Sequence, residues 1–135
     1  MTAVDLLTRR FTALQRGDFA TVYTTYHPEA PFLRQFADRT SYQRFAEQQL
    51  SAIEVVSWRS LRQREIDAAQ QEHLLVMELA VAGARQYFYE LALLLRTAAG
   101  WRYHSAQKLS AEDYAGPPEA IDFVHFDQAD ERLRY

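Results

Sequence analysis

The feature that most constrains the fold is a succession of long segments with alternating apolar residues between positions 73 and 109. They follow a helical first third of the chain and are separated by short turns that contain Gly83 and Gly100. Long alternating segments joined by glycine turns are typical of antiparallel strands in a meander. A less regular stretch before them, Ile53–Ile66, predicts a longer, bulged first strand. The later strands are predicted at His73–Ala82, Gln86–Arg96 and Trp101–Leu109.

The residues ahead of this sheet predict three helices, each with an apolar stripe at spacings of three and four. Polar residues suited to N-caps precede the stripes, and a glycine and a proline end the first two helices. The boundary residues are Thr2 with Asp5, Gly17, Asp18, His27-Pro28, and either Thr40 or Ser41.

Helices followed by a long meander predict an α+β fold, with three N-terminal helices packed on a strongly curved antiparallel four-stranded sheet. Such a sheet closes into a cone with a pocket inside. We expect this domain to span residues 1–109. Residues 110–135 form an acidic, aromatic-containing C-terminal tail that packs on the domain or on a partner. Both sheet faces are partly apolar, so both must be covered.

Composition excludes several kinds of chemistry. The chain has 135 residues and no cysteine, which rules out disulfides, thiol catalysis, iron–sulfur clusters and thiolate zinc sites. The net charge is −3, and the basic residues do not cluster, so we expect no nucleic-acid partner. The start of the chain lacks the basic and apolar regions of a signal peptide, and no apolar run is long enough to span a membrane. We therefore expect a cytoplasmic protein.

Several short motifs between Leu6 and Leu109 resemble a known superfamily. They are Tyr26-His27-Pro28, Ala80-Val81-Ala82-Gly83 leading to Tyr89-Glu90-Leu91, and Gly100-Trp101-Arg102-Tyr103. In this order the chain resembles the nuclear transport factor 2-like superfamily, and within it the middle domain of bacterial YchJ-like proteins. Those proteins carry a cysteine-rich zinc motif, which this chain lacks. The resemblance therefore implies the cone fold but no zinc-dependent partner and no defined reaction.

Titratable residues in the strands are the candidates for chemistry. Superfamily enzymes such as ketosteroid isomerases use an Asp, Glu or His in the cone for proton transfer, so Glu78, Glu90 and His104 are candidate catalytic residues. The alternative, which we favour, places these three on one solvated or interface face with Arg96 and Arg102, in cross-strand ion pairs. The expected ligand-pocket residues are Tyr23, Tyr26, His27, Tyr89, Trp101 and Tyr103.

The expected sheet faces follow from alternation. One face is expected to carry residues of three strands: Leu75, Met77 and Leu79, then Tyr87, Tyr89 and Leu91, then Trp101 and Tyr103. The opposite face is expected to carry their neighbours: Leu74, Val76 and Glu78, then Phe88, Glu90 and Leu94, then Arg102, His104 and Ala106. The four histidines have no metal-ligand spacing, so we expect neither a metal nor a cofactor.

Two functions of different class remain open. The first, which we favour, is a binding or assembly domain that forms a homodimer through the sheet face and holds a small apolar ligand. The second is a small-molecule isomerase, dehydratase or cyclase that uses a pocket carboxylate or histidine.

Overall fold

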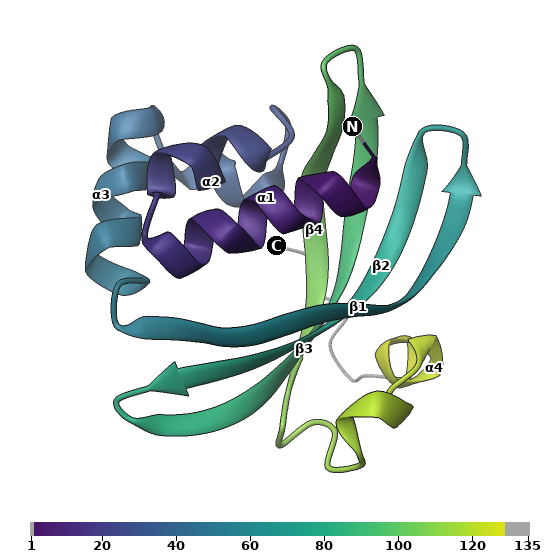
Figure 1. Cartoon of the computed structure of the whole chain (residues 1–135). Helices are drawn as coiled ribbons and strands as arrows, with labels where there is room; N and C mark the ends of the chain where they lie inside the picture. Colours follow the sequence, from purple (N-terminus) through teal and green to yellow (C-terminus); the bar gives the residue numbers. More distant parts are fainter. Residues whose placement is uncertain (1, 129–135) are drawn as a thin grey trace.

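The computed structural model describes residues 2–128 and confirms the predicted α+β architecture, with helices first and a four-stranded antiparallel sheet after them (Figure 1). Residues 129–135 of the predicted tail lie outside the described residues. The elements are α1 (Ala3–Arg16), α2 (Phe19–Thr25), η1 (Pro31–Gln35), α3 (Arg39–Gln49), β1 (Ile53–Asp67), β2 (Gln70–Val81), β3 (Ala84–Thr97), β4 (Gly100–Ser110), η2 (Pro118–Ala120) and α4 (Phe123–Asp127).

The helix ends agree with the sequence signals, with one exception. Thr2 and Asp5 form a reciprocal capping box, in which the Asp5 N–H donates to Thr2 Oγ1 (3.1 Å) and the Thr2 N–H donates to Asp5 Oδ2 (2.8 Å). Gly17 ends α1 in the left-handed conformation, with φ 68°. The prediction for α3 is wrong. Its N-cap is Asp38, ahead of both expected residues, because the Asp38 carboxylate accepts a hydrogen bond from the Ser41 N–H (2.8 Å).

The strands pair in sequence order, β1-β2-β3-β4, each antiparallel to the next. The pairing of β1 with β2 is interrupted by three register shifts, and that of β3 with β4 by one. Each such irregularity bends a strand and increases its twist. The sheet therefore curls around the helices, as Figure 1 shows. The β1 shifts lie between Val55 and Ser57, Ser60 and Arg62, and Glu65 and Asp67.

The register between β2 and β3 contradicts the expected sheet faces. The hairpin turn pairs Val81 with Ala84, so odd-numbered residues of β2 lie opposite even-numbered residues of β3. Leu75 is therefore opposite Glu90, and the face toward the helices carries Glu90 rather than Tyr89. The prediction placed the odd-numbered residues of both strands on one face. It is wrong because the two-residue turn pairs odd-numbered residues of β2 with even-numbered residues of β3.

The register shift in the β3–β4 pairing also contradicts the expected sheet faces. Leu93 is opposite Ser105 and Leu94 is opposite Tyr103, so His104 is the extra residue of the bulge. After the bulge, Ala106 lies in the same core cluster as Tyr103. The sequence placed these two residues on opposite faces, because simple alternation assumes an uninterrupted strand.

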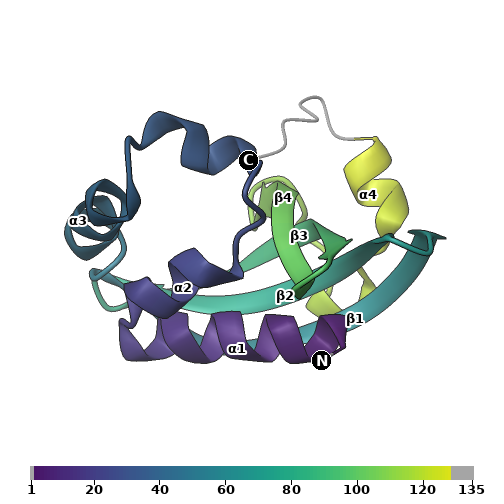
Figure 2. The ribbon, with the colours of Figure 1, turned by 90° about the horizontal axis from the view of Figure 1, so that it is seen from above.

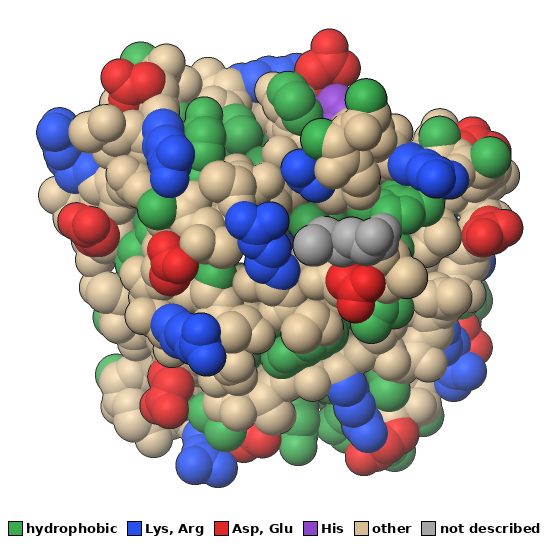
Figure 3. Space-filling view, turned by 45° about the horizontal axis from the view of Figure 1, so that its top comes forward, with side chains coloured by type: hydrophobic (Ala, Val, Ile, Leu, Met, Phe, Trp, Pro, Cys, Tyr) green, Lys and Arg blue, Asp and Glu red, His purple; other side chains and the backbone are tan. Residues whose placement is uncertain are grey.

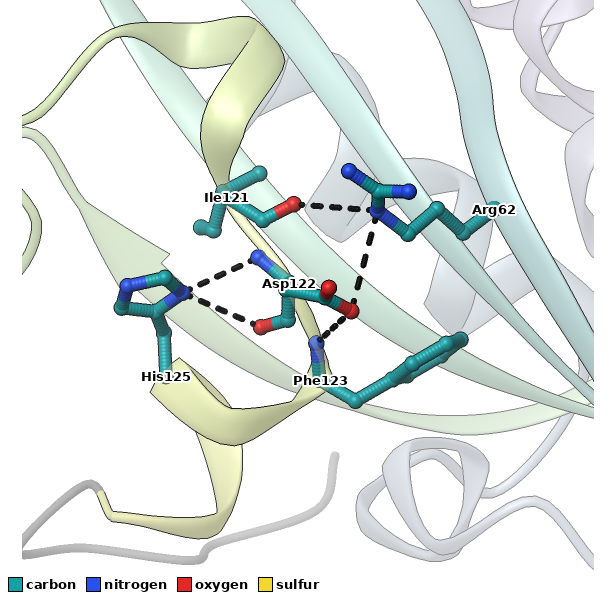
Figure 4. Close-up of polar contacts among 5 residues, drawn as sticks. All are labelled: Arg62, Ile121, Asp122, Phe123 and His125. Atoms are coloured by element: carbon teal, nitrogen blue, oxygen red, sulfur yellow. Dashed lines mark hydrogen bonds and ion pairs between the residues drawn. The ribbon is translucent and has the colours of Figure 1, made fainter.

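The face of the sheet away from α1 is covered by the tail (Figure 1). Ile121 and Phe126 are fully buried there, in one cluster with Leu74, Val76 and Tyr89. The tail is also held to β1 by polar contacts, several of which Figure 4 shows. Arg62 Nε lies 3.5 Å from the Ile121 carbonyl oxygen and 3.6 Å from Asp122 Oδ1, and the Arg64 guanidinium lies 4.2 Å from the centre of the Phe123 ring.

Candidate ligand cavity

A cavity of about 300 Å³ lies between the helices and the inner face of the sheet. That volume is at the lower end of the range for small-molecule pockets. Its wall is mainly apolar, with contributions from α1, α2 and all four strands. The wall residues with polar groups are Arg10, Tyr26, Tyr89, Glu90, Tyr103 and Lys108.

Arg10 is the most unusual residue of the cavity wall. It follows Leu6 and Leu7 by three or four positions, so it lies on the buried face of α1, and only 8% of it is exposed. Its Nη1 donates to Thr25 Oγ1 (3.0 Å) and its Nη2 to the Tyr26 hydroxyl (3.2 Å). The guanidinium carbon lies 4.4 Å from the centre of the Tyr26 ring and 3.9 Å from that of Tyr103. Two aromatic rings and two hydroxyl groups therefore hold the cation in place.

The charged form of Arg10 is retained despite its burial. Burial alone would lower the pKa of the guanidinium, but Tyr26, Tyr103 and the charge of Glu90 together raise it above its usual value. Arg10 thus supplies a permanent positive charge to a largely apolar cavity. Sequence analysis missed this residue, although its spacing from Leu6 and Leu7 places it on the apolar stripe of α1.

Glu90 and Tyr103 form a hydrogen-bonded pair in the same wall. The Tyr103 hydroxyl donates to Glu90 Oε2 at 3.2 Å. Tyr103 is 1% exposed, and burial together with the Glu90 charge raises its pKa well above the usual range. The phenol is therefore a proton-bearing donor at all physiological pH values. Lys108 is opposite Glu90 in the β3–β4 register and also lines the cavity.

The structure does not bring the three candidate catalytic residues together. Only Glu90 lines the cavity. Glu78 is on the other face of the sheet, where its Oε1 lies 3.5 Å from Arg85 Nη1. His104 is in the β4 bulge, with its Nδ1 2.9 Å from Ser105 Oγ and its ring 5.7 Å from that of His27. The interpretation that all three share one ion-paired face is therefore wrong.

Three of the six expected pocket residues line the cavity. Tyr26 and Tyr103 line the cavity, as does Tyr89, whose ring packs edge-on against Tyr114 in the cluster under the tail. Tyr23 and Trp101 are not in the cavity wall; Tyr23 lines a separate groove, and Trp101 is buried in the core.

His27 connects the end of α2 to the sheet. Its N–H donates to the Tyr103 carbonyl oxygen (2.8 Å), next to an isolated bridge between Tyr26 and Tyr103. Its Nδ1 accepts a hydrogen bond from the Glu29 N–H (3.0 Å). Within residues 2–128, no group of three or more His, Asp or Glu side chains is arranged to hold a metal ion.

The chain is similar in structure to known proteins of very different sequence. A ketosteroid isomerase-like protein from Erwinia carotovora atroseptica superposes with a TM-score of 0.61 at 15% identity, over 78% of this chain and 91% of that one. A domain of unknown function with a cystatin-like fold from Nostoc punctiforme superposes with a TM-score of 0.60 at 12% identity, over 80% of this chain and 78% of that one. No protein-family model and no curated protein matches the sequence.

These similarities establish the class of fold. The element order, the curled sheet and the helices on its inner face define the nuclear transport factor 2-like fold, which the sequence motifs predicted. At 12–15% identity the likeness concerns the fold alone. No helix in the described part of the chain is long and apolar enough to cross a membrane.

Proposed function

We propose that this chain is a small-molecule-binding protein whose cavity takes a compact, largely apolar ligand with an anionic oxygen placed against Arg10. The observation that carries the proposal is a buried guanidinium in the wall of a mainly apolar cavity. A buried charge costs free energy unless it is paired and hydrogen-bonded. Within residues 2–128, the groups hydrogen-bonded to Arg10 are the neutral hydroxyls of Thr25 and Tyr26.

The hydrogen-bonding capacity of Arg10 is not exhausted by its protein partners. A guanidinium carries five N–H donors, and the hydrogen bonds to Thr25 and Tyr26 use two of them. A carboxylate on the ligand would add charge-assisted hydrogen bonds, which are about twice as strong as neutral ones. The apolar wall, including Leu14, Met77 and Phe88, would contact the rest of the ligand.

Titration with phenylacetate, followed by ¹H–¹⁵N NMR, tests this proposal. Phenylacetate has an apolar body and a carboxylate, whereas phenylacetamide has the same shape without the charge. We expect saturable shifts at residues of the cavity wall, and at least tenfold weaker binding of phenylacetate by Arg10→Met, with little change for phenylacetamide.

The neighbouring Arg9 offers a matched control, because it is exposed and its Nη2 bonds to Thr24 Oγ1. Arg9→Met should bind phenylacetate like the unmodified chain. Equal losses in Arg9→Met and Arg10→Met, or shifts confined to residues outside the cavity, would contradict the proposed binding mode.

A second candidate function, proton transfer on a bound carbonyl compound, is favoured by Glu90. This residue is a cavity carboxylate held by the protonated Tyr103 phenol, so it is placed to take a proton from a carbon next to a carbonyl group. Arg10 would then stabilise the negative charge that develops on the carbonyl oxygen. The similarity to a protein described as ketosteroid isomerase-like supports this candidate.

Deuterium exchange into cyclohexanone in D₂O, measured as the loss of its ¹H NMR signal, tests the second candidate without knowledge of the substrate. A positioned base contributes about 10²–10⁴-fold in rate. Glu90→Gln should therefore lower the catalysed exchange rate by at least 100-fold. Glu78→Gln is the matched control on the opposite face and should leave the rate unchanged. Equal rates in Glu90→Gln and the unmodified chain would exclude Glu90 as the base.

We also infer a YchJ-like relationship from the sequence motifs around Tyr26, Tyr89 and Trp101.

We infer that the chain forms a homodimer through the outer sheet face. Tyr87 on that face is 42% exposed and is available to a second copy beside the tail. Light scattering at micromolar concentration should give twice the chain mass, and Tyr87→Glu should give the monomer mass. A monomer in both samples would contradict the dimer.

A further inference from the structure

A second depression lies apart from the cavity, at the end of the sheet where β3 turns into β4. It is a groove of about 580 Å³, bounded by α2, η1, the start of α3 and the β3–β4 turn. Seen from above in Figure 2, α2, α3 and β4 surround this region. Tyr26 lines both the groove and the cavity and so forms a common wall.

Three arginines from different elements line the groove. Arg34 comes from η1, Arg39 from the first residue of α3, and Arg102 from β4. No residue that lines the groove in the described part of the chain is Asp or Glu. Arg39 interacts electrostatically with Asp18, but Asp18 is the N-cap residue of α2 and does not line the groove.

Local stability explains the position of Arg34, in the last turn of η1, but not that of Arg39. Arg39 occupies the first turn of α3, where the partial positive charge of the helix terminus disfavours a cation. Within residues 2–128, none of the three arginines forms an ion pair. Arg102 Nη1 donates to the Trp101 carbonyl oxygen (2.8 Å), which anchors one side of its guanidinium. An anion in the groove would offset the mutual repulsion of the three cations.

The groove also has the other features of a built binding site. The hydroxyl group of Tyr23 provides a neutral donor, while Pro28 and Leu33 provide apolar surface. The hydroxyls of Thr24 and Thr97 also line the groove, but they donate to the carbonyl oxygens of Thr21 (2.6 Å) and Gly100 (2.7 Å). Figure 3 shows one face of the molecule, on which Lys and Arg side chains stand beside apolar side chains. Such a combination suits a ligand with a charged end and an apolar body.

We propose that the groove binds a small organic phosphate ester, with the phosphoryl oxygens bonded to Arg34, Arg39 and Arg102 and the organic part against Pro28 and Leu33. A phosphoryl group offers three acceptor oxygens and nearly two negative charges, which matches three guanidinium groups better than a single carboxylate does. Neither Arg10 nor Glu90 lines the groove, so the proposed phosphate ligand contacts different charged residues from the cavity ligand.

Isothermal titration calorimetry of the full chain with phenyl phosphate, inorganic phosphate and phenol tests the proposal. We expect phenyl phosphate to bind and phenol not to bind. Tighter binding of phenyl phosphate than of phosphate identifies an organic ester as the ligand class. Equal binding of the two would assign the site to inorganic phosphate and overturn the ester proposal.

Single substitutions of the groove arginines complete the test. Each of Arg34→Gln, Arg39→Gln and Arg102→Gln should weaken phenyl phosphate binding about tenfold or more. Arg16→Gln is the control, because Arg16 is exposed at the C-terminal end of α1 and does not line the groove. Undetectable binding of phenyl phosphate at millimolar concentration, or an equal loss in the control, would overturn the proposal. Unchanged binding in Arg10→Met would show that the groove acts independently of the cavity.

Discussion

The guanidinium of Arg10 lies 3.9 Å from the centre of the Tyr103 ring, and Tyr103 in turn donates its hydroxyl hydrogen to Glu90. A buried cation and a carboxylate of the cavity wall are thus connected through one phenol. This arrangement allows the stabilising role of Arg10 to be separated from its proposed role in binding.

We expect Arg10→Met to change the free energy of unfolding by less than about 1.5 kcal/mol, because a buried charge can be replaced by an apolar side chain of similar size at little cost. Arg10→Ala should lower it by about 2–4 kcal/mol, since it leaves a void between the Tyr26 and Tyr103 rings. Urea denaturation measures both values. If Met is as destabilising as Ala, the guanidinium itself is needed for folding.

The tail should contribute to the stability of the whole domain. Phe126 is fully buried against the outer face of the sheet, whereas Val124 on the same short helix is 47% exposed. Phe126→Ala should lower the free energy of unfolding by about 2–4 kcal/mol, and Val124→Ala should change it by less than about 0.5 kcal/mol. Thermal denaturation compares the two variants. Similar melting temperatures would show that the tail is not part of the cooperative fold.

The β2–β3 hairpin contains a residue whose substitution should raise the free energy of unfolding. Ala82 has φ 52° and precedes Gly83, which has φ 81°, so both turn residues are in the left-handed region. Asparagine tolerates this conformation better than alanine and is favoured before glycine in such turns. Ala82→Asn should raise the free energy of unfolding by about 0.5–1 kcal/mol. Ala98→Asn in the β3–β4 turn should give no gain, because Ala98 does not have a positive φ.

His73 predicts a loss of stability in mild acid. It is fully buried in β2, its Nε2 is 3.0 Å from Gln71 Oε1, and burial lowers its pKa. Below the usual histidine pKa of about 6.5, the unfolded chain binds a proton that the folded chain does not bind. The free energy of unfolding therefore falls as the pH is lowered through this value, by at most about 1.4 kcal/mol per pH unit from this residue.

Urea denaturation at pH 7.5 and pH 5.5 measures this dependence. His73→Asn removes the titrating group, so its stability should depend less steeply on pH than that of the unmodified chain. The same slope in both proteins would show that other groups cause the acid sensitivity.

Most of the fold could be predicted from the sequence, because alternation and capping are local signals. The Thr2–Asp5 capping box, Gly17 and the four strands follow directly from them. The face of the sheet on which each side chain lies could not be predicted, since it depends on the number of residues in each turn and on the bulge at His104. One residue added to a turn or strand exchanges the two faces of the sheet.

The candidate site was predicted only in part, for the same reason. Glu90 was named, but the sequence grouped it with Glu78, which is on the opposite face. Arg10 was missed because an arginine in a helix is usually exposed, and the rings that hold it come from residues 26 and 103. Contacts between residues so distant in sequence are set by tertiary structure and leave no local pattern.

The irregular pairing of β1 also affects how the protein behaves in solution. This strand is at the edge of the sheet, and straight, exposed edges recruit strands from other molecules. Three bulges bend it, and Arg59 and Arg62 along it are paired with Glu119 and Asp122 of the tail. The bulges and ion pairs of this strand therefore protect the chain against edge-to-edge aggregation.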